Sequence, residues 1–390
     1  MRWEVVRDEI NTLAAARSWA DQPVAAVFEA LDLSELDALL AGALPSAPQC
    51  AFLGCHLGPL LAATAAELHC TMLPPVSGLV FAPYHPHLYT PDELYDRFDP
   101  DRPASYRDCL DWTVYESLVD PLTRRQRPAD VELALFRRIH DASITDALDE
   151  LLNEQGRQRC VAVMGGHDVL RNSQTYAEIA QLGWQLGAAG YVVLTGGGPG
   201  LMEAANLGAF CAGFADPSAA IERSLNMLRP APRYDHPDWL ATAWRARSAL
   251  GAPDHRRLSL NIGIPTWFYG HEPPNVFATH IAKYFENSVR EEGLLAAAVG
   301  GLIVAPGNAG TVQEIFQDAC QNYYRAVDGT RSPMILLGSD YWTIDKPVWP
   351  LLQALAAERG FANYVTLTDD LTGIVEFLRS HPPERDVPGH

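Results

Sequence analysis

LIVAPGNAGTVQEIFQDACQNYY, residues 302–324, is the stretch that decides the predicted fold. Residues 302–305 form an apolar run with the length of a buried β-strand. The run from Pro306 to Gly310 contains a proline and two glycines and predicts a turn. From Thr311 onward the apolar residues recur at helical spacing. The stretch therefore predicts a strand, a glycine-rich turn and a helix.

The start of this predicted helix is suited to receive an anion. Residues 311–314 are expected in its first turn. The N–H groups of a first turn have no intrahelical acceptor, and the helix dipole is positive there, so phosphate can bind. Glu314 then stands one turn into the helix, able to face the ligand, although a glutamate at a helix start also suits the dipole without any ligand.

Strand-like and helical segments alternate regularly from Cys160 onward. Strands are expected at residues 160–164, 191–195, 259–265, 302–305, 334–338 and 364–367. Helices are expected at residues 173–189, 201–214, 275–291, 311–324, 341–359 and 371–379. Near-continuous apolar strands alternating with helices predict an α/β fold, a doubly wound Rossmann-like parallel sheet with helices on both faces. Ligands of such sheets bind at the C-terminal ends of the strands.

The N-terminal part has a less regular pattern. Residues 1–45 have the leucine spacing of two amphipathic helices, and a long helix is expected at residues 129–155. Between them, residues 72–127 hold many prolines and predict irregular structure. We therefore expect a mainly helical N-terminal region of unknown role, residues 1–155, followed by a Rossmann-like domain, residues 156–390.

Composition excludes several classes of protein. The chain has 390 residues, 48% of them hydrophobic, and a formal net charge of −19. That charge argues against nucleic-acid binding, which depends on Lys and Arg contacts to phosphates, but a small phosphorylated ligand needs only local donors. No apolar run has the length of a membrane span, and the N-terminus does not resemble a signal peptide. A soluble, cytoplasmic protein without membrane contact is expected.

Neither the cysteines nor the histidines have the spacing of a metal site. The seven cysteines are odd in number and form no CxxC pair, which favours reduced thiols over disulfides or zinc. The segment PYHPHLY, residues 83–89, lacks metal-ligand spacing on a regular element, and structural packing is the expected role of its histidines. No metal site is predicted.

Three glycine turns follow three of the predicted strands. They are Gly165-Gly166, then Gly196-Gly197-Gly198, then the turn from Pro306 to Gly310. One such turn is weak evidence, but three at one sheet edge predict a phosphate site. His167 and Asp168 follow the first turn and are expected either to contact base or ribose or to form a solvated turn. No G-x-G-x-x-G follows the first strand, which disfavours a dinucleotide site.

Two of these turns lie in motifs that resemble a known family. GGGPGLMEAANLGA, residues 196–209, and PGNAGTVQE, residues 306–314, are similar to the two signatures of the LOG ("lonely guy") family. The resemblance covers residues 160–378. It implies hydrolysis of the N-glycosidic bond of a nucleoside 5′-monophosphate to free base and ribose 5-phosphate, without a metal or other cofactor. AMP or a cytokinin riboside monophosphate is the implied substrate, and a homodimer or higher homo-oligomer the implied assembly.

The resemblance also assigns the site residues. Glu314 and Arg290 match the catalytic pair, in which the arginine holds phosphate or the departing base. Asn308 stands where the family has a glycine, and Glu291 where it has a lysine. Residues implied to bind the substrate or its phosphate are Gly165, Gly166, Gly196, Gly197, Gly198, Met202, Gly307, Asn308, Ala309, Gly310 and Thr311.

Two alternatives to an N-glycosidase stay open. A nucleotide-binding or sensing protein could keep the phosphate turns and have no turnover, as the departures at Asn308 and Glu291 allow. A dinucleotide-dependent oxidoreductase is a more distant possibility. A lysine decarboxylase would need a pyridoxal lysine, and neither Lys283 nor Lys346 has a suitable context.

Overall fold

The computed structural model describes residues 7–268, 273–327 and 329–385. The chain divides into two compact units. The first consists of Met1–His87 and Pro128–Ala147, and the second of Leu88–Arg127 and Leu148–His390. Residues 88–127 thus group with the second unit, although they lie inside the N-terminal region expected from sequence.

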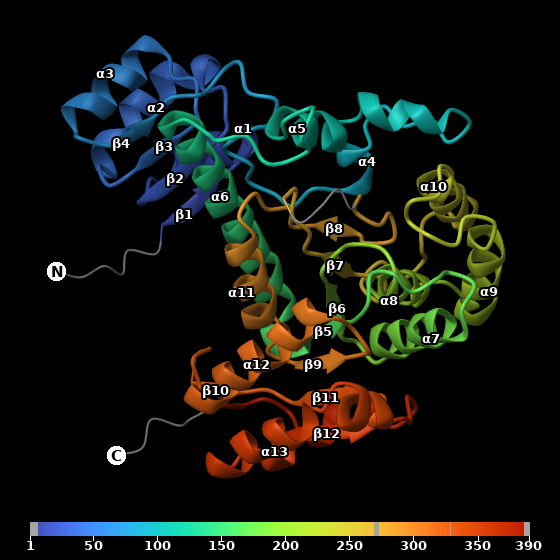
Figure 1. Cartoon of the computed structure of the whole chain (residues 1–390). Helices are drawn as coiled ribbons and strands as arrows, with labels where there is room; N and C mark the ends of the chain where they lie inside the picture. The colour runs from blue at the N-terminus through green and yellow to red at the C-terminus, as the bar shows by residue number, and fades with distance from the viewer. Residues whose placement is uncertain (1–6, 269–272, 328, 386–390) are drawn as a thin grey trace. The chain divides into compact units, whose positions relative to one another are not determined.

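The first unit is built on a four-stranded parallel sheet (Figure 1). In spatial order its strands are β1 (Asp8–Ile10), β2 (Ala26–Glu29), β3 (Ala51–Leu53) and β4 (Thr71–Leu73). Its helices are α1 (Leu13–Trp19), α2 (Asp37–Ala43) and α3 (Pro59–Glu67). The long helix α6 (Val131–Gln155) begins in this unit and ends in the second.

The prediction of a mainly helical N-terminal region was wrong. Strands of three or four residues are too short to show a period of two, so sequence periodicity missed them. Leu33 and Leu36, which suggested a helix, are buried in the core of the sheet but precede the α-helix that starts at Asp37. Phe28 on β2 stacks on Phe52 of β3, with 5.0 Å between ring centroids.

The second unit is built on a seven-stranded sheet in which every neighbouring pair is parallel. The predicted α/β class with a parallel sheet is therefore confirmed. In spatial order the strands are β12 (Val365–Thr368), β11 (Met334–Leu337), β9 (Gly301–Val304), β5 (Cys160–Met164), β6 (Val192–Thr195), β7 (Asn261–Gly263) and β8 (His280–Ile281).

Helices alternate with these strands along the chain, except that β8 follows β7 with no helix among the described residues between them (Figure 1). They are α7 (Gln174–Ala188), α8 (Leu201–Cys211), α9 (Pro217–Leu228), α10 (Trp239–Leu250), α11 (Asn287–Ala297), α12 (Ala309–Tyr324), α13 (Trp349–Glu358) and α14 (Ile374–Ser380). Residues 88–127 add α4 (Pro91–Leu94) and α5 (Leu110–Leu118). A short antiparallel pair joins β10 (Thr330–Arg331) to β13 (Glu384–Arg385).

The helix predicted at residues 275–291 was wrong over most of its length. That segment contains β8, and α11 begins only at Asn287. The buried side chain of Asn275 accepts hydrogen bonds from the N–H groups of Phe277 and Ala278, each at 3.2 Å, which closes a turn in place of a helix. Its amide donates to the carbonyl oxygen of Gly198 and so fixes this turn against the second glycine turn.

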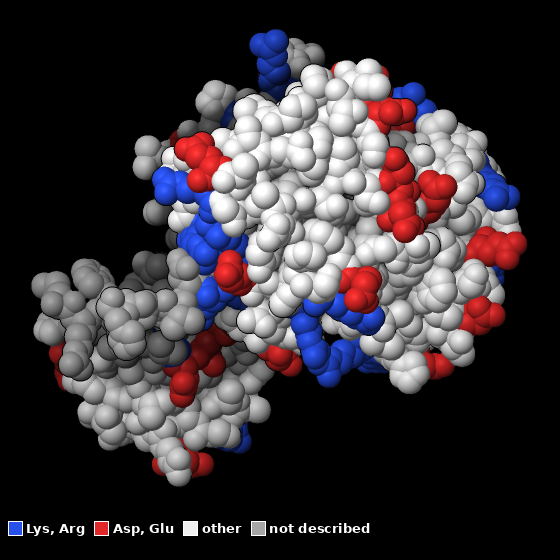
Figure 2. Space-filling view, turned by 90° about the horizontal axis from the view of Figure 1, so that it is seen from below, with Lys and Arg blue, Asp and Glu red and all other residues white. Residues whose placement is uncertain are grey.

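Charged groups of both signs stand among wide uncharged areas on the face drawn in Figure 2. Charged side chains of the second unit also form ion pairs, such as Arg245 with Asp101 and Arg247 with Asp92. All seven cysteines are free thiols, and only Cys320 is exposed. Among the described residues, no helix combines the length and the apolar character needed to cross a membrane.

The backbones of helices α7 and α8 are in direct contact at two glycines. A Cβ atom added at Gly208 of α8 would lie 1.8 Å from the carbonyl oxygen of Ala180. One added at Gly183 of α7 would lie 2.2 Å from the carbonyl oxygen of Ala205. Because backbone atoms cannot move aside as a flexible side chain can, the pair depends on the missing side chains.

We expect Gly208→Ala to destabilise the second unit by about 1–3 kcal/mol or more, because the methyl group forces the two backbones apart. Gly293→Ala is the matched control, since Gly293 also lies in a helix and an added Cβ meets no atom within 4 Å. The free energy of unfolding of the control should rise by roughly 0.5–1 kcal/mol, because alanine lowers the backbone entropy of the unfolded chain. Denaturant midpoints measure both effects, and equal midpoints for the two variants would contradict this packing.

Candidate functional site

The strand order of the seven-stranded sheet reverses between β5 and β9. The chain continues from β5 to β6 on one side, whereas β9 leads to β11 on the other. The loops that leave the C-terminal ends of β5 and β9 therefore diverge, and such a switch point is where open α/β sheets bind ligands. The Gly166 N–H donates to the carbonyl oxygen of Pro306 at 3.0 Å, which ties the first glycine turn to the third.

A pocket of about 230 Å³ opens at this switch point. Its walls come from all three glycine turns, from α11 and from the start of α12. The lining residues are Met164, Gly165, Gly166, His167, Gly196, Met202, Arg290, Glu291, Asn308, Ala309, Gly310, Thr311 and Glu314. The structure therefore brings together ten of the residues expected from sequence and adds Met164, His167 and Glu291.

Three expected ligand contacts, Gly197, Gly198 and Gly307, do not line this pocket, and two of them are positions where the backbone itself needs glycine. Gly197 has φ of +71°, and a Cβ atom there would lie 2.7 Å from Pro265. A Cβ atom at Gly307 would lie 2.2 Å from the Thr311 hydroxyl oxygen. The first of these glycines permits a left-handed turn, and Gly307 permits close approach to the helix start.

Helix α12 begins two residues earlier than expected, at Ala309. Its first i to i−4 bond runs from the Val312 N–H to the Asn308 carbonyl at 3.1 Å. The N–H groups of residues 309–311 have no acceptor within the helix, and all three residues line the pocket. Glu314 consequently lies in the second turn. Asn308 has φ of −94°, so the residue that stands in place of the family's glycine does not need the left-handed backbone that favours glycine.

The Gly307-Asn308 turn is held by Lys346 and Tyr341. Lys346 Nζ donates to the Gly307 carbonyl oxygen at 2.8 Å and to Asn308 Oδ1 at 2.9 Å. Tyr341 Oη donates to the same Gly307 carbonyl at 2.5 Å and accepts from Lys346 at 2.8 Å. Sequence reasoning missed both residues. The available signal was a lysine and a tyrosine in the segment that follows another strand of the same sheet, β11.

Arg290 and Glu314 face each other in the pocket. Arg290 Nη1 lies 3.9 Å from Glu314 Oε1, within range of an ion pair but longer than a hydrogen bond. Burial raises the pKa of Glu314 to about 7, against the lowering effect of Arg290, and the nearby charge of Glu291 raises it further. The carboxyl group is therefore close to half ionised near neutral pH.

Glu291 is fixed by two amide side chains. Asn287 Nδ2 donates to Glu291 Oε1 at 2.7 Å, and Gln313 Nε2 donates to Glu291 Oε2 at 3.0 Å. Asn287 and Glu291 lie one turn apart on α11, whereas Gln313 comes from α12. The carboxylate therefore joins the two helices that carry Arg290 and Glu314.

The second glycine turn is supported by a buried polar network. The Thr195 hydroxyl donates to Asn206 Oδ1 at 2.7 Å and accepts from the Gly197 N–H at 2.9 Å. Glu203, on the helix α8 that follows this turn, pairs with Arg171, whose Nε donates to Oε2 at 2.8 Å. Both side chains of that pair are almost fully buried, so Glu203 holds the loop after β5 against α8.

The two lysines of the chain have structural partners. Lys283 is buried and pairs with Asp111 of α5, which also accepts from Trp267 Nε1 at 3.0 Å. Lys346 holds the turn described above. These contacts agree with the sequence-based view that neither lysine is placed as a pyridoxal ligand.

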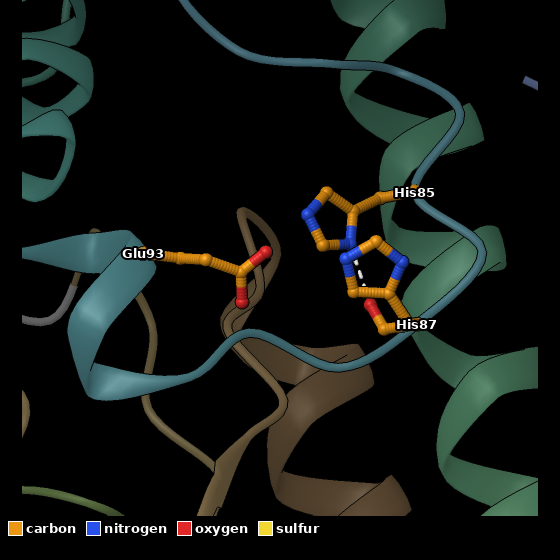
Figure 3. Close-up of side chains that lie close together, drawn as sticks. All are labelled: His85, His87 and Glu93. Carbon is orange, nitrogen blue, oxygen red and sulfur yellow. Dashed lines mark hydrogen bonds between the residues drawn. The ribbon is translucent and has the colours of Figure 1, made fainter. Parts of the chain in front are cut away.

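The histidines of the PYHPHLY segment lie in the first unit. Figure 3 shows the His85 ring turned toward the main-chain carbonyl of His87, with 2.5 Å between Nδ1 and that oxygen. His85 is buried and His87 exposed. Glu93, also drawn there, belongs to the second unit, where its carboxylate accepts from the Thr90 N–H in the capping box of α4.

Of the pair His167 and Asp168, which follow the first glycine turn, only His167 lines the pocket.

Comparison with known proteins found a family match over part of this chain. Residues 158–215 match the model of the SLOG cluster4 family. A search of curated proteins found no match. Among solved structures, the chain is similar to the molybdenum cofactor binding protein from the phototrophic bacterium Rippkaea orientalis, with 18% identity and a TM-score of 0.33 over 57% of this chain and 95% of that chain. The matched SLOG segment contains the first two glycine turns and ends before Arg290.

A second acidic group on α12 responds to burial. Asp318 lies one turn after Glu314, is buried, and accepts a 3.2 Å hydrogen bond from Asn322 Nδ2. Burial raises its pKa to about 7. The pKa of Asp318 is therefore higher in the folded than in the unfolded protein. The stabilisation of the fold by the protonated carboxyl group is complete below about pH 4 and is lost as pH rises through about 7.

Asp318→Asn should therefore stabilise the protein increasingly as pH rises. Asparagine has nearly the same shape and never ionises, so its advantage over aspartate should be small near about pH 4 and reach a plateau above about pH 7. Thermal melts across this range measure the difference. The exposed Asp340, changed to Asn, is the control and should show no such trend. A pH-independent difference for Asp318→Asn would contradict a neutral buried carboxyl group.

Proposed function

We propose that the protein hydrolyses the N-glycosidic bond of a nucleoside 5′-monophosphate. The proposed substrate is a purine nucleotide such as AMP, or a cytokinin riboside monophosphate. The observation that carries this proposal is the partly buried Glu314 carboxyl group, with a pKa raised to about 7 and Arg290 beside it, in the switch-point pocket. Perturbed acids in a cleft are typical of acid–base chemistry.

The start of α12 is the proposed phosphate site. The N–H groups of Ala309, Gly310 and Thr311 and the positive end of the helix dipole favour an anion there. Lys346 fixes the preceding turn and adds a positive charge close to it. A phosphate held at this end would leave the sugar to extend along the pocket toward Glu314.

Cleavage would move the electron pair of the C1′–N bond onto the base and leave positive charge on C1′ and the ring oxygen. The Glu314 carboxylate would stabilise that charge and take a proton from the attacking water. Water oxygen bonds to C1′, and the base gains one proton, so the products are free base and ribose 5-phosphate. Arg290 would hold the phosphate or the departing base. This chemistry needs no cofactor.

A nucleotide-binding protein without turnover is the second candidate. The observation that favours it is the extent of the family match, which covers residues 158–215 but neither Arg290 nor Glu314. The 3.9 Å separation between Arg290 Nη1 and Glu314 Oε1 also agrees with an ion pair that only stabilises the fold. For either function we propose a cytoplasmic homodimer, as the LOG resemblance implies.

Glu314→Gln should lower the rate of base release about 10²–10⁴-fold, a barrier increase of roughly 3–5 kcal/mol, because it removes the carboxylate but keeps the shape. Nucleotide binding should be retained, since the proposed phosphate contacts are unchanged. Chromatography of AMP, GMP, CMP and cytokinin monophosphates after incubation measures base release. Glu292→Gln, at an exposed glutamate outside the pocket, is the control.

The outcomes of this assay separate the candidates. If the wild-type protein binds the nucleotides but leaves them intact, the proposal of an enzyme gives way to that of a nucleotide-binding protein. Base release that survives Glu314→Gln would remove Glu314 from its proposed role.

The pH dependence of kcat/KM should follow the ionisation of Glu314. The carboxylate is the proposed active form, so kcat/KM should rise about tenfold per pH unit below about 7 and level off above it. In Glu291→Gln the midpoint should move to lower pH, because a negative neighbour that raises the Glu314 pKa is removed. Activity that falls as pH rises through about 7 would instead indicate a protonated, acid role for Glu314.

A further inference from the structure

Glu291 contributes a second carboxylate to the pocket wall. It follows Arg290 on α11, and the pocket is lined by both residues together with Glu314. The negative charge of Glu291 also adds to the raised pKa of Glu314. A ligand that fills this pocket meets both side chains, because both line it.

The Glu291 carboxylate is oriented before any ligand arrives. Each of its oxygens accepts one hydrogen bond, from Asn287 at 2.7 Å and from Gln313 at 3.0 Å. A carboxylate has about four acceptor positions, so these two bonds leave each oxygen able to accept another donor. Fixing the group in advance lowers the entropy cost of binding that donor.

The charge of Glu291 excludes some ligand groups and favours others. A carboxylate repels phosphate, so the phosphate belongs at the N-terminus of α12 and not beside Glu291. The remaining polar groups of a nucleotide sugar are hydroxyls, which are neutral donors. Hydrogen bonds from a hydroxyl to a carboxylate are charge-assisted and stronger than bonds between neutral groups.

Because Glu291 and Glu314 line the same pocket, the hydroxyl nearest the reacting carbon is the candidate for Glu291. In the proposed reaction Glu314 faces C1′ of the sugar, and C2′ is the next ring carbon, so its hydroxyl is close to the reacting centre. A second carboxylate that lines the pocket with Glu314 suits that hydroxyl. A site built to bind a hydroxyl disfavours an analogue that lacks it, because its own polar group is then left without the donor.

We propose that Glu291 accepts a hydrogen bond from the 2′-hydroxyl and thereby selects ribonucleotides over 2′-deoxyribonucleotides. This inference rests on the proposed function, because it uses the same pocket and substrate class. It makes Glu291 a specificity-determining residue.

The test compares AMP with 2′-deoxy-AMP. For the wild-type protein, kcat/KM for AMP should exceed that for 2′-deoxy-AMP by about 10–100-fold, the effect of one charge-assisted hydrogen bond. In Glu291→Gln this ratio should fall toward one, mainly through loss of activity on AMP. Glu292→Gln, the exposed neighbour, should keep the wild-type ratio.

Gln313→Leu is a second variant that keeps the Glu291 charge but removes one of its two anchors. For this variant the ratio of kcat/KM for AMP to kcat/KM for 2′-deoxy-AMP should lie between the ratios of the wild type and Glu291→Gln. A wild-type ratio near one, or an equal loss on both nucleotides in Glu291→Gln, would overturn the assignment.

Failure of the proposed function gives a different result. If no monophosphate loses its base, the same two nucleotides and the same variants are compared by calorimetric Kd. A wild-type preference for AMP that Glu291→Gln abolishes would then support the assignment in a binding protein. Equal Kd values for the two nucleotides in the wild type would overturn it.

Discussion

The hydrogen bond from the Gly166 N–H to the Pro306 carbonyl oxygen joins the two loops on which the pocket depends. These loops leave neighbouring strands in opposite directions, so without a link the switch point would be an open gap. With it, the first glycine turn and the start of α12 face one pocket. The Lys346 and Asn275 contacts then fix the third and second turns in the same way.

The sequence predicted the second unit far better than the first, for a physical reason. Apolar strands such as residues 160–164 are buried on both faces and read as continuous runs, so their pattern is visible without a partner. The three- and four-residue strands of the first unit have no such pattern and depend on contacts between distant residues. The Asn275 turn is closed by local bonds from Phe277 and Ala278, but its anchor at Gly198 is remote in sequence and could not be predicted.

The residues of the pocket divide in the same way, into those that local sequence predicts and those that depend on distant contacts. Residues inside the two motifs were predicted because local turns and a helix start impose their own geometry. Lys346 and Tyr341 were missed because they act on the Gly307-Asn308 turn from beyond another strand. Glu291 was visible only as a departure from a family pattern. Its anchoring by Gln313 needs α11 and α12 side by side, which sequence alone does not show.

The spread of the pocket along the chain has a consequence for its timing during synthesis. Its lining begins at Met164 and ends at Glu314, and the turn before α12 is held by Lys346. A chain that has emerged only through α8 has two glycine turns but neither Arg290 nor the α12 start. A growing chain therefore cannot present the complete pocket to any ligand until nearly the whole sheet has been made.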